Sequence, residues 1–571
     1  MIVTGEAGVP TVELFDSPNQ RLVFGVSVTA TTAQQPIQTT PQPANQEEQK
    51  PIELEVIGTP DTGYQVPRTS VGTKTDTQLR DIPQTVQVIP RQLIEDRGAN
   101  NSGEALRNLG IGAAGFPSRF NGEYQNSGSF IDFQHTQRYF VAPVISWQPG
   151  KDTKLTIEAD YQNLRQSFFE TGLPAAGTVL PNPNGKLSRS LYLGEQKLDQ
   201  ESHELGRISY YFEHKFNENW LLHNAFRFAF ARNNSEGNVL PISLLGDNRT
   251  LTRRYLVYNQ PRVTNTYELD TNVVGKFKTG SLSHQLLAGV DLYSLIDIQN
   301  YLLQNLIPIN IFNPVYGQYT LGSPSRLNNK TRKGAAGFYL QDQIALTNKL
   351  KLVLGGRVDI ERNKFTDFIN SNNNSDKTDT AFSPRIGIIY QPIESVSLSA
   401  SYSCSFEQVG GADINSNPFK PSRGTQYEIG VKTDLLNNKL VATLALYQIT
   451  KNNITTTDPN NTLFNIQVGE QRSRGVELNL IGEILSGWNI IASYNYNDPR
   501  ITRDNTYKVG NLLNNAPENS AALWTTYTIP KGGWKGFGGG IGVNYVDSRF
   551  GDLDNSFRLP SYVTADAAIG T

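Results

Sequence analysis

The sequence predicts an all-β protein, built as a large antiparallel barrel with an apolar outside and a wet inside. The first observation is an alternation with a period of two residues. From Val396 to Phe406 every second residue is a serine, and the residues between are Val, Leu, Ala, Tyr, Cys and Phe. Successive side chains of a strand point to opposite faces, so one face of this segment is apolar and the other carries hydroxyl groups.

The second observation is that the same alternation returns along the chain. Three further examples are Leu155–Gln162, Phe226–Phe230 and Leu440–Tyr447. The segments are about 8–12 residues long, and no helical pattern separates them. Many amphipathic strands in one chain are typical of a barrel whose outside meets lipid.

The third observation is the length of the connections among eighteen candidate strands, which run from about Ser118 to Thr571. Short connections, at 148–153, 214–219, 346–349, 391–395 and 436–439, alternate with long ones, at 170–198, 233–248, 301–330, 407–422 and 500–518. Short periplasmic turns and long extracellular loops are typical of outer-membrane barrels, which have an even number of strands. We interpret Thr250–Phe277 as one projecting strand, although a hairpin within it is the alternative.

The composition agrees with such a barrel. Of the 571 residues, 37% are hydrophobic, and the mean hydropathy of −0.41 is that of a soluble protein. A barrel resolves this conflict, because only every second residue of a strand meets lipid. The net charge of −2 argues against binding to nucleic acid. The single cysteine, Cys404, lies on the apolar face of its strand and is interpreted as a small lipid-facing side chain.

The region before the barrel divides into four parts. Residues 1–30 are strand-like at Thr11–Phe15 and Leu22–Phe24, and residues 31–50 form a Gln/Pro/Thr linker that we expect to be poorly ordered. Residues 51–60 hold a short β-prone segment. Residues 61–117 suggest an α/β piece with helix candidates at Arg91–Arg97 and Gly103–Leu109. The start of the chain lacks the pattern of an export signal, so upstream sequence is missing or the protein is not exported.

Several segments, in order, resemble those of the TonB-dependent ferric-siderophore receptors, and most closely the cyanobacterial type with a leading amidase-enhancer (AMIN) domain. The matching segments are Gly5–Phe15, which resembles the end of the AMIN domain, Thr73–Gln84, which resembles the opening of the plug domain, and Tyr124–Phe130, Ile311–Tyr316, Phe419–Glu428 and Gly469–Gly475, which resemble barrel signatures. The resemblance implies a 22-stranded barrel around an α/β plug. It covers nearly the whole chain.

The chain also departs from this family. After Leu106–Leu109 it passes directly to what matches the third strand of the family, so most of the plug and two strands are missing. The segment Asp566–Ile569 matches a strand that two more should follow. Eighteen strands therefore remain of 22, and we expect them either to close by pairing the first with the last or to stay open. On this reading the plug remnant cannot seal the lumen, and the chain is impaired as a receptor.

The resemblance places the TonB box at Glu53, Leu54, Glu55, Val56 and Ile57. A short β-prone segment behind a mobile linker suits the addition of a strand to the sheet edge of a periplasmic partner. The alternative is an ordinary strand or a tether. The acidic Glu55 is unusual for such a box.

Other motifs have ordinary explanations. The glycine-rich Gly536–Gly542 lacks the helix and Lys-Ser or Lys-Thr of a phosphate-binding loop, so we interpret it as a strand with small inner residues. The five histidines show no zinc-site spacing, and His214 and His284 are predicted at a membrane interface. Aromatic residues of the long loops either contact a ligand or, as we favour, form the interfacial girdle or pack loop on loop; they are Phe168, Phe169, Tyr192, Tyr301, Phe312, Tyr316 and Tyr319.

The resemblance implies an outer-membrane receptor that imports a ferric siderophore with energy from TonB, and that acts as a monomer in outer-membrane lipid. The sequence indicates no enzyme, cofactor or bound metal, and it does not name the chelate. A passive channel or a non-functional truncated remnant is the second hypothesis. A soluble β-rich adhesin or sugar-binding enzyme is the third, and the alternating loop lengths speak against it.

Overall fold

The computed structural model describes residues 11–17, 21–27, 68–71, 73–75, 77–86, 88, 119–167, 172–411, 413–415, 417–458 and 465–570. Within these ranges nearly all regular structure is β-strand, and the helical turns are the short 3-10 turns η1 (Leu79–Asp81) and η2 (Ser371–Asn373). The described residues include no helix that is long and apolar enough to span a membrane. The predicted all-β class is confirmed.

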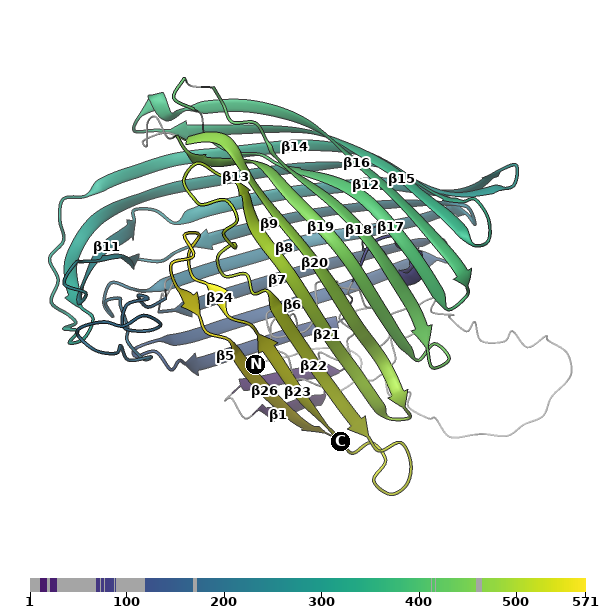
Figure 1. Cartoon of the computed structure of the whole chain (residues 1–571), viewed down its shortest axis with the longest axis horizontal. Coiled ribbons are helices and arrows are strands. Elements are labelled where there is room, and N and C mark those ends of the chain that lie inside the picture. The colour runs from purple at the N-terminus through teal and green to yellow at the C-terminus, as the bar shows by residue number, and fades with distance from the viewer. Residues whose placement is uncertain are drawn as a thin grey trace, which may run out of the picture.

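One antiparallel sheet of twenty-two strands dominates the molecule (Figure 1). Setting aside the hairpins β1–β2 and β10–β11 leaves eighteen strands in the barrel wall, the number predicted. They are β5 (Arg119–Gly128), β6 (His135–Gly150), β7 (Thr153–Gln166), β8 (Glu201–Asn217), β9 (Trp220–Asn233), β12 (Arg262–Thr279), β13 (Leu282–Asn310), β14 (Ser325–Ala345), β15 (Leu350–Asp367), β16 (Ser375–Ile393), β17 (Val396–Glu407), β18 (Ser422–Leu435), β19 (Leu440–Thr457), β20 (Asn465–Leu485), β21 (Trp488–Arg503), β22 (Asn519–Thr528), β23 (Gly538–Val546) and β26 (Tyr562–Gly570).

The interpretation of Thr250–Phe277 as one strand is wrong. The segment contains β11 (Thr250–Tyr258) and the start of β12, separated at Pro261. Proline has no backbone N–H to donate, so it interrupts the ladder. β11 forms a hairpin with β10 (Gly237–Leu244) and pairs with the outer half of β13, while β12 pairs with the inner half.

The predicted alternation separates two faces of the wall. Leu398 and Leu444 are 39% and 42% exposed on the outer face, as expected for side chains that meet lipid. Ser397 and Ser401, on the opposite face of β17, are 2% and 8% exposed. They are covered from inside, where Ser397 donates a hydrogen bond to the carbonyl of Arg80. The apolar face is therefore outside, and the polar face is packed against another part of the chain.

Long and short connections lie at opposite ends of the barrel, as predicted. The short end joins strands through turns such as 486–487, between β20 and β21, and 394–395, between β16 and β17. The predicted loop 301–330 is shorter than expected, because β13 continues to Asn310 and β14 begins at Ser325. We call the short-turn end periplasmic and the long-loop end extracellular.

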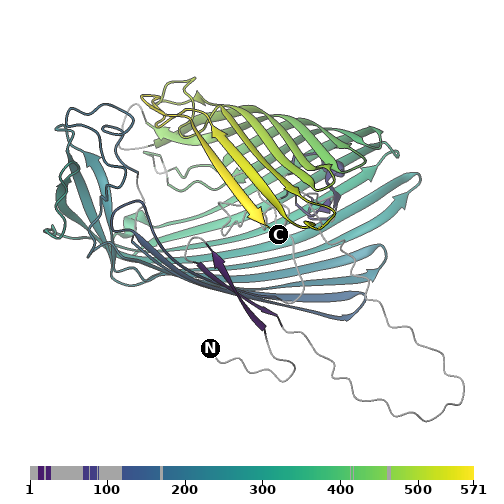
Figure 2. The same cartoon turned by 90° about the horizontal axis from the view of Figure 1, so that it is seen from below.

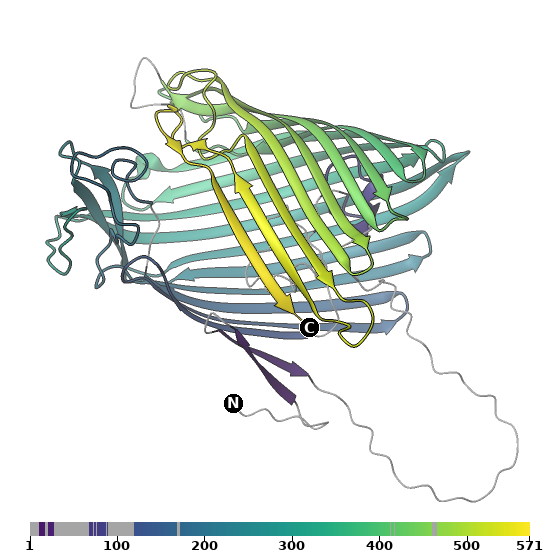
Figure 3. The ribbon, with the colours of Figure 1, turned by 60° about the horizontal axis from the view of Figure 1, so that its bottom comes forward.

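The two possibilities for closure are decided in favour of an open sheet among the described strands. β26 pairs with β23, and β5 pairs with β6 and with β2 (Arg21–Ser27), which forms a hairpin with β1 (Thr11–Ser17). Figures 2 and 3 show β26 at one edge of the curved sheet, separate from β5 and the β1–β2 hairpin at the other. The strands predicted near Thr11–Phe15 and Leu22–Phe24 are confirmed as β1 and β2.

Two short strand pairs complete the described structure. β3 (Arg68–Thr69) pairs with β4 (Thr77–Gln78), and β24 (Arg549–Phe550) pairs with β25 (Arg558–Leu559) in the connection between β23 and β26. The 31–50 linker, the helix candidates Arg91–Arg97 and Gly103–Leu109, and the TonB-box candidate Glu53–Ile57 lie outside the described residues.

A charge on the outer face should destabilise the barrel more than the same charge one residue further along. We expect Leu478→Arg to cost about 2–4 kcal/mol of unfolding free energy, because the middle of the outer face meets hydrocarbon. Asn479→Arg points into the lumen beside Glu477 and should cost less than about 1 kcal/mol. Denaturant unfolding in lipid vesicles, followed by tryptophan fluorescence, measures both. Equal losses for the two variants would contradict the assigned faces.

Candidate functional site

The best-built polar site of the barrel lies on its inner wall. The described residues of 68–86 (all but 72 and 76), which we call the inner segment, lie on the lumen side of β12–β18 (Figure 1). The Nζ atom of Lys74 lies 2.5 Å from Oδ2 of Asp270 on β12 and 4.0 Å from the centre of the Tyr339 ring on β14. The Tyr339 hydroxyl donates to the same Asp270 carboxylate. Carboxylate and ring thus hold one ammonium from two sides.

The turn at η1 is fixed by a lysine from the wall. Lys432 on β18 donates from Nζ to the carbonyl oxygens of Leu79, Ile82 and Gln84, at 2.8, 2.6 and 2.7 Å. Ile82 has no exposed surface. Three acceptors match the three donors of an ammonium group, so this turn is bound through its backbone.

Pro83 requires a glycine in the wall. A Cβ atom on Gly387 of β16 would lie 2.4 Å from Cγ of Pro83, which is closer than real atoms approach. Any larger residue at this position would push the turn away from the sheet. The segment Thr73–Gln84, which resembles the opening of a plug domain, therefore fits one particular part of the wall, the part around Gly387 on β16.

Further ion pairs and hydrogen bonds fix the end of the segment. Thr85 donates from its backbone N–H and its hydroxyl to Oε1 of Glu428, at 2.6 and 2.8 Å. Asp81 pairs with Lys351 at 2.6 Å, and the Gln84 side chain accepts from Arg385 at 2.7 Å. These wall residues come from β15, β16 and β18. Their side chains all point into the lumen.

The extracellular end carries a second compact unit, formed by residues 172–200, the β10–β11 hairpin and residues 301–322. We call it the platform. Two apolar clusters build its core; the first contains Leu187, Leu191, Leu193, Leu251, Ile309 and Ile311, and the second contains Leu198, Val239, Tyr255 and Leu306. Because both clusters join loop residues to β11 and β13, the platform is a folded continuation of the wall.

A buried ion pair lies inside the platform. The side chains of Arg253 and Glu195 are each 1% exposed, and their Nη2 and Oε1 atoms are 3.1 Å apart. Arg253 also donates to the carbonyl oxygens of Gly194 and Ile307, and Glu195 accepts from the backbone of Gly317. Every contact joins two different platform loops, so the pair holds them in one arrangement.

Next to this pair, Tyr192 donates a 2.7 Å hydrogen bond to Asp199. Burial raises the pKa of Asp199 to about 7, even though the Tyr192 hydrogen bond opposes the shift. Burial, together with the charge of Asp199, raises the pKa of Tyr192 above its ordinary range. The platform thus contains a carboxyl group that titrates near neutral pH.

The loop aromatics pack on one another, as favoured. Tyr192 is 1% exposed, and the Tyr316 hydroxyl donates to its carbonyl oxygen. Phe312 and Tyr319 pack against the two apolar clusters, and Tyr301 lies 6.3 Å from the Tyr258 ring. Phe168 and Phe169 lie outside the described residues. Phe133 was not predicted; its ring contacts those of Tyr192 and Tyr316, and its φ of 64° is unusual for an aromatic residue.

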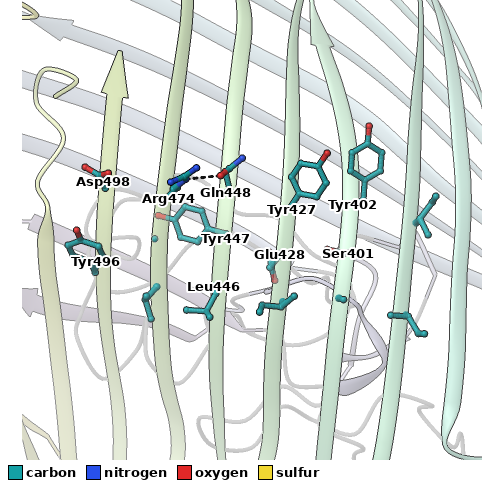
Figure 4. A pocket seen from close by; sticks show the side chains of 16 residues that line it. Ser401, Tyr402, Tyr427, Glu428, Leu446, Tyr447, Gln448, Arg474, Tyr496 and Asp498 are labelled. Atoms are coloured by element: carbon teal, nitrogen blue, oxygen red, sulfur yellow. Dashed lines mark hydrogen bonds between the residues drawn. The ribbon is translucent and has the colours of Figure 1, made fainter. Parts of the chain in front are cut away.

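Tyrosine side chains on the outer face of the wall mark the level of the membrane–water interface on the extracellular side. Figure 4 shows a hollow over β16–β21 in which Tyr402, Tyr427 and Tyr496 stand above apolar side chains, with Arg474 donating to Gln448. Tyrosines at this level are typical of a membrane interface. Cys404 follows Tyr402 on the same face, as predicted, and its thiol contacts the Tyr402 hydroxyl at 3.0 Å.

The histidine and glycine interpretations also agree with the structure. His214 and His284 lie near the short turns and stack with Phe212 and Phe277 at 6.4 and 4.9 Å between ring centres. Gly540 and Gly542 lie on the inner face of β23, where a Cβ atom on either would approach the Trp524 ring to 2.7 Å. Within the described part of the chain, no group of three His, Cys, Asp or Glu side chains is placed to hold a metal ion.

Sequence reasoning missed the wall residues that hold the inner segment. Lys74 and Asp270 are 196 residues apart, and Lys432 lies 350 residues from Ile82. Asp270 and Lys432 are charged residues on the lumen faces of β12 and β18, but they share those faces with other charges, such as Glu268 and Glu428. Without the strand register, however, their partners could not be named.

These features define a β-barrel of the outer-membrane type, with an internal segment bound to its wall. Residues 146–571 match the family described as TonB dependent receptor-like, beta-barrel. The chain belongs to the TonB-dependent receptors.

Curated relatives include a metal-pseudopaline receptor of Pseudomonas aeruginosa, 34% identical over 78% of this chain and 64% of its own length. The ferrichrome outer membrane transporter/phage receptor of Escherichia coli is 32% identical over 76% of this chain and 60% of its own length. The chain therefore spans less than two thirds of the length of these relatives. A structure of FpvA of P. aeruginosa with a bound pyoverdine–iron complex superposes with a TM-score of 0.73 at 19% identity, over 88% of this chain and 82% of that chain, and supports the fold.

Removing the cation of the buried pair should loosen the platform. We expect Arg253→Met to cost about 3–5 kcal/mol of local stability, because the Glu195 carboxylate stays buried without its partner. Limited proteolysis within residues 172–200 measures the loss. Arg249→Met is the matched control, since the Arg249 side chain is 58% exposed and its pairing with Asp247 is worth less than about 1 kcal/mol.

A double variant separates charge from packing. Adding Glu195→Gln to Arg253→Met removes the unpaired charge and should restore part of the protection. If the double variant is cleaved faster than Arg253→Met alone, the unpaired charge of Glu195 does not explain the loss of protection from proteolysis in Arg253→Met.

The platform should also be more stable in acid than above neutral pH. Folding raises the pKa of Asp199 from its ordinary value of 3.8 to about 7, so this group contributes its full stability below pH 4. That contribution falls between these two values and is lost as the pH rises through about 7. Proteolysis rates from pH 5.5 to 8.5, normalised to an unstructured peptide in the same tube, test this. Asp199→Asn should abolish the dependence, and an unchanged slope in that variant would contradict it.

Proposed function

We propose that this chain is an outer-membrane receptor that imports a ferric siderophore with energy supplied through TonB. The observation that carries the proposal is the inner segment, held in the lumen of a TonB-dependent receptor barrel by residues of β12–β18. A segment held by hydrogen bonds and ion pairs, rather than by a continuous apolar core, is suited to leave the wall when it is pulled. The printed names of the relatives, receptors for metal-pseudopaline and ferrichrome, support an iron or metal chelate as the ligand.

The remaining parts of the proposal follow the resemblance. Residues 1–30 are a fragment of an AMIN-like domain, residues 31–50 a linker, residues 51–60 the TonB-box region and residues 61–117 a plug domain shorter than is usual in the family. Residues 118–571 form the barrel, which lies as a monomer in outer-membrane lipid. TonB binds Glu53–Ile57 by adding this segment to the edge of its own sheet.

Growth on a chelate tests the function. The chain, placed behind an export signal, is expressed in cells that lack their own siderophore receptors, with ferrichrome or ferrioxamine B as the iron source. We expect growth on at least one chelate, slower than with the host's own receptor because the shortened plug does not seal the lumen, and we expect this growth to disappear in a strain without TonB. Val56→Pro should reduce iron uptake at least tenfold, because proline cannot donate the backbone hydrogen bond of an added strand.

Two controls define the outcomes. Ala44→Pro lies in the linker and should leave uptake unchanged, because it adds a proline without touching the box. Growth that persists without TonB would indicate a passive channel. A folded barrel at the cell surface that supports no growth on any chelate would contradict the receptor function.

A further inference from the structure

The hollow on the outer face of β16–β21 changes in chemistry toward the extracellular end (Figure 4). Residues paired in register on neighbouring strands lie side by side, so the register divides this face into rows. On β20 the outward residues Val476, Arg474 and Arg472 follow one another toward the extracellular end. Together with their partners on the neighbouring strands they define a lower, a middle and an upper row.

The lower row is apolar and exposed. Val476 pairs with Leu446 of β19, and Leu446 pairs with Ile429 of β18. Ile429 and Leu446 are 55% and 44% exposed. The row continues to the small Ala400 of β17. An apolar row on the outer face of such a barrel meets the acyl chains of lipids.

The middle row is aromatic at one end and charged at the other. The ring centres of Tyr402 and Tyr427 are 5.2 Å apart, and tyrosines on the outer face are typical of the headgroup level. On the same row Arg474 donates from Nε to the side chain of Gln448 at 2.7 Å. The Nη1 and Nη2 atoms of Arg474 have no hydrogen-bond partner among the described residues. This guanidinium group is therefore held in place with two nitrogen atoms available to an anion.

The upper row places two positive charges opposite each other. Arg472 of β20 is paired in register with Arg500 of β21. Like charges directly opposite one another destabilise a sheet. Arg500 is compensated, because it pairs with Asp498 at 2.6 Å and donates to the carbonyl oxygen of Gly510 at 2.9 Å.

Arg472 lacks such compensation among the described residues. Its Nε atom is buried and has no hydrogen-bond partner there. On its other side the row continues with the uncharged Thr450. The next outward residue of β20, Glu470, accepts a hydrogen bond from Thr502 at 2.8 Å. The upper row therefore has an excess positive charge and a buried donor without an acceptor.

We propose that the hollow binds one membrane lipid through a phosphate group in its headgroup. The phosphate lies at Arg472 and Arg474, and the acyl chains lie along the lower row. Phosphate oxygens accept paired hydrogen bonds from a guanidinium group, and the negative charge offsets the repulsion between Arg472 and Arg500. The proposal requires only that the barrel lies in a membrane, and it does not depend on which chelate is imported.

The rows favour a lipid over the other possible occupants. A free phosphate ion would leave the apolar lower row unused. Two copies of the chain that met through this face would bring the same excess of positive charge together, because such an interface joins identical surfaces. A lipid with a phosphate headgroup matches the apolar, aromatic and cationic rows in the order in which they occur.

Lipid binding to the full chain tests the site. The folded barrel in dodecyl maltoside micelles is titrated with dioleoyl phosphatidic acid, and native mass spectrometry counts the bound lipid. We expect one tightly bound molecule per barrel. Dioleoylglycerol, which has the same chains and no phosphate, should bind at least tenfold more weakly, because it cannot accept the hydrogen bonds of the arginines.

Three variants locate the site, and the heat-dependent gel shift of a folded barrel shows that each has folded. Arg472→Gln should lower the affinity for phosphatidic acid at least tenfold, and Ile429→Ser should lower it about threefold by removing contact with the chains. Arg362→Gln is the matched control. The Arg362 side chain is 63% exposed and pairs with Asp376, so this variant should bind as the unchanged chain does.

The other outcomes each contradict the proposal. Equal binding of the two lipids, or an unchanged affinity in Arg472→Gln, would show that the phosphate is not recognised. If millimolar inorganic phosphate displaces the lipid and Ile429→Ser has no effect, the site takes a free anion and the lipid assignment is wrong. Pairs of barrels that form without added lipid and separate in Arg472→Gln would assign the face to a second copy of the chain.

Discussion

The structure depends on one constraint, which is the cost of leaving a backbone N–H or C=O group without a hydrogen-bond partner in hydrocarbon. An unpaired group costs several kcal/mol, and a sheet that curves around a lumen satisfies nearly all such groups. β13 illustrates the result, since it pairs with β12 and β11 on one side and with β14 on the other. With the backbone bonds committed to neighbouring strands, alternate side chains must face lipid and lumen.

This alternation sends charges inward, where they need partners of opposite sign. Some partners come from nearby strands, as when Arg357 on β15 donates across β14 to Asp291 on β13. Others come from the inner segment, as with Lys74 and Asp270. The lumen wall is therefore a surface of paired charges, and the inner segment is one participant in that pairing. Its contacts can be exchanged for water more readily than an apolar core can.

Features that depend on the two-residue alternation of side chains were predictable from the sequence. Features that depend on which strands pair, and in which register, were not. Leu398 and Leu444 lie on the lipid side, and Gly540 and Gly542 leave room for Trp524, as local patterns indicated. The end of β11 at Tyr258 was missed, although Asn259–Arg262 interrupts the alternation there, because one strand projecting past the membrane also accounted for the length of the segment.

The wall site was harder to predict for the same reason. Lys432 and the turn it binds are far apart in sequence, and no periodicity links them. The aromatic side chains of the long loops gave no indication of whether they face solvent or one another, since that depends on how the loops fold together. The sequence therefore predicted which face of each strand is apolar, whereas the contacts across the lumen became known only from the structure.

The length of β13 has a mechanical consequence. Its 29 residues extend roughly 95 Å at about 3.3 Å each, far beyond the roughly 30 Å of hydrocarbon that a membrane presents. The outer part of this strand carries Leu306 and Ile309, which belong to the cores of the platform. The shorter part of the strand therefore lies in the membrane, and the longer part lies outside it. A small change in the tilt of the wall becomes a larger displacement at the mouth.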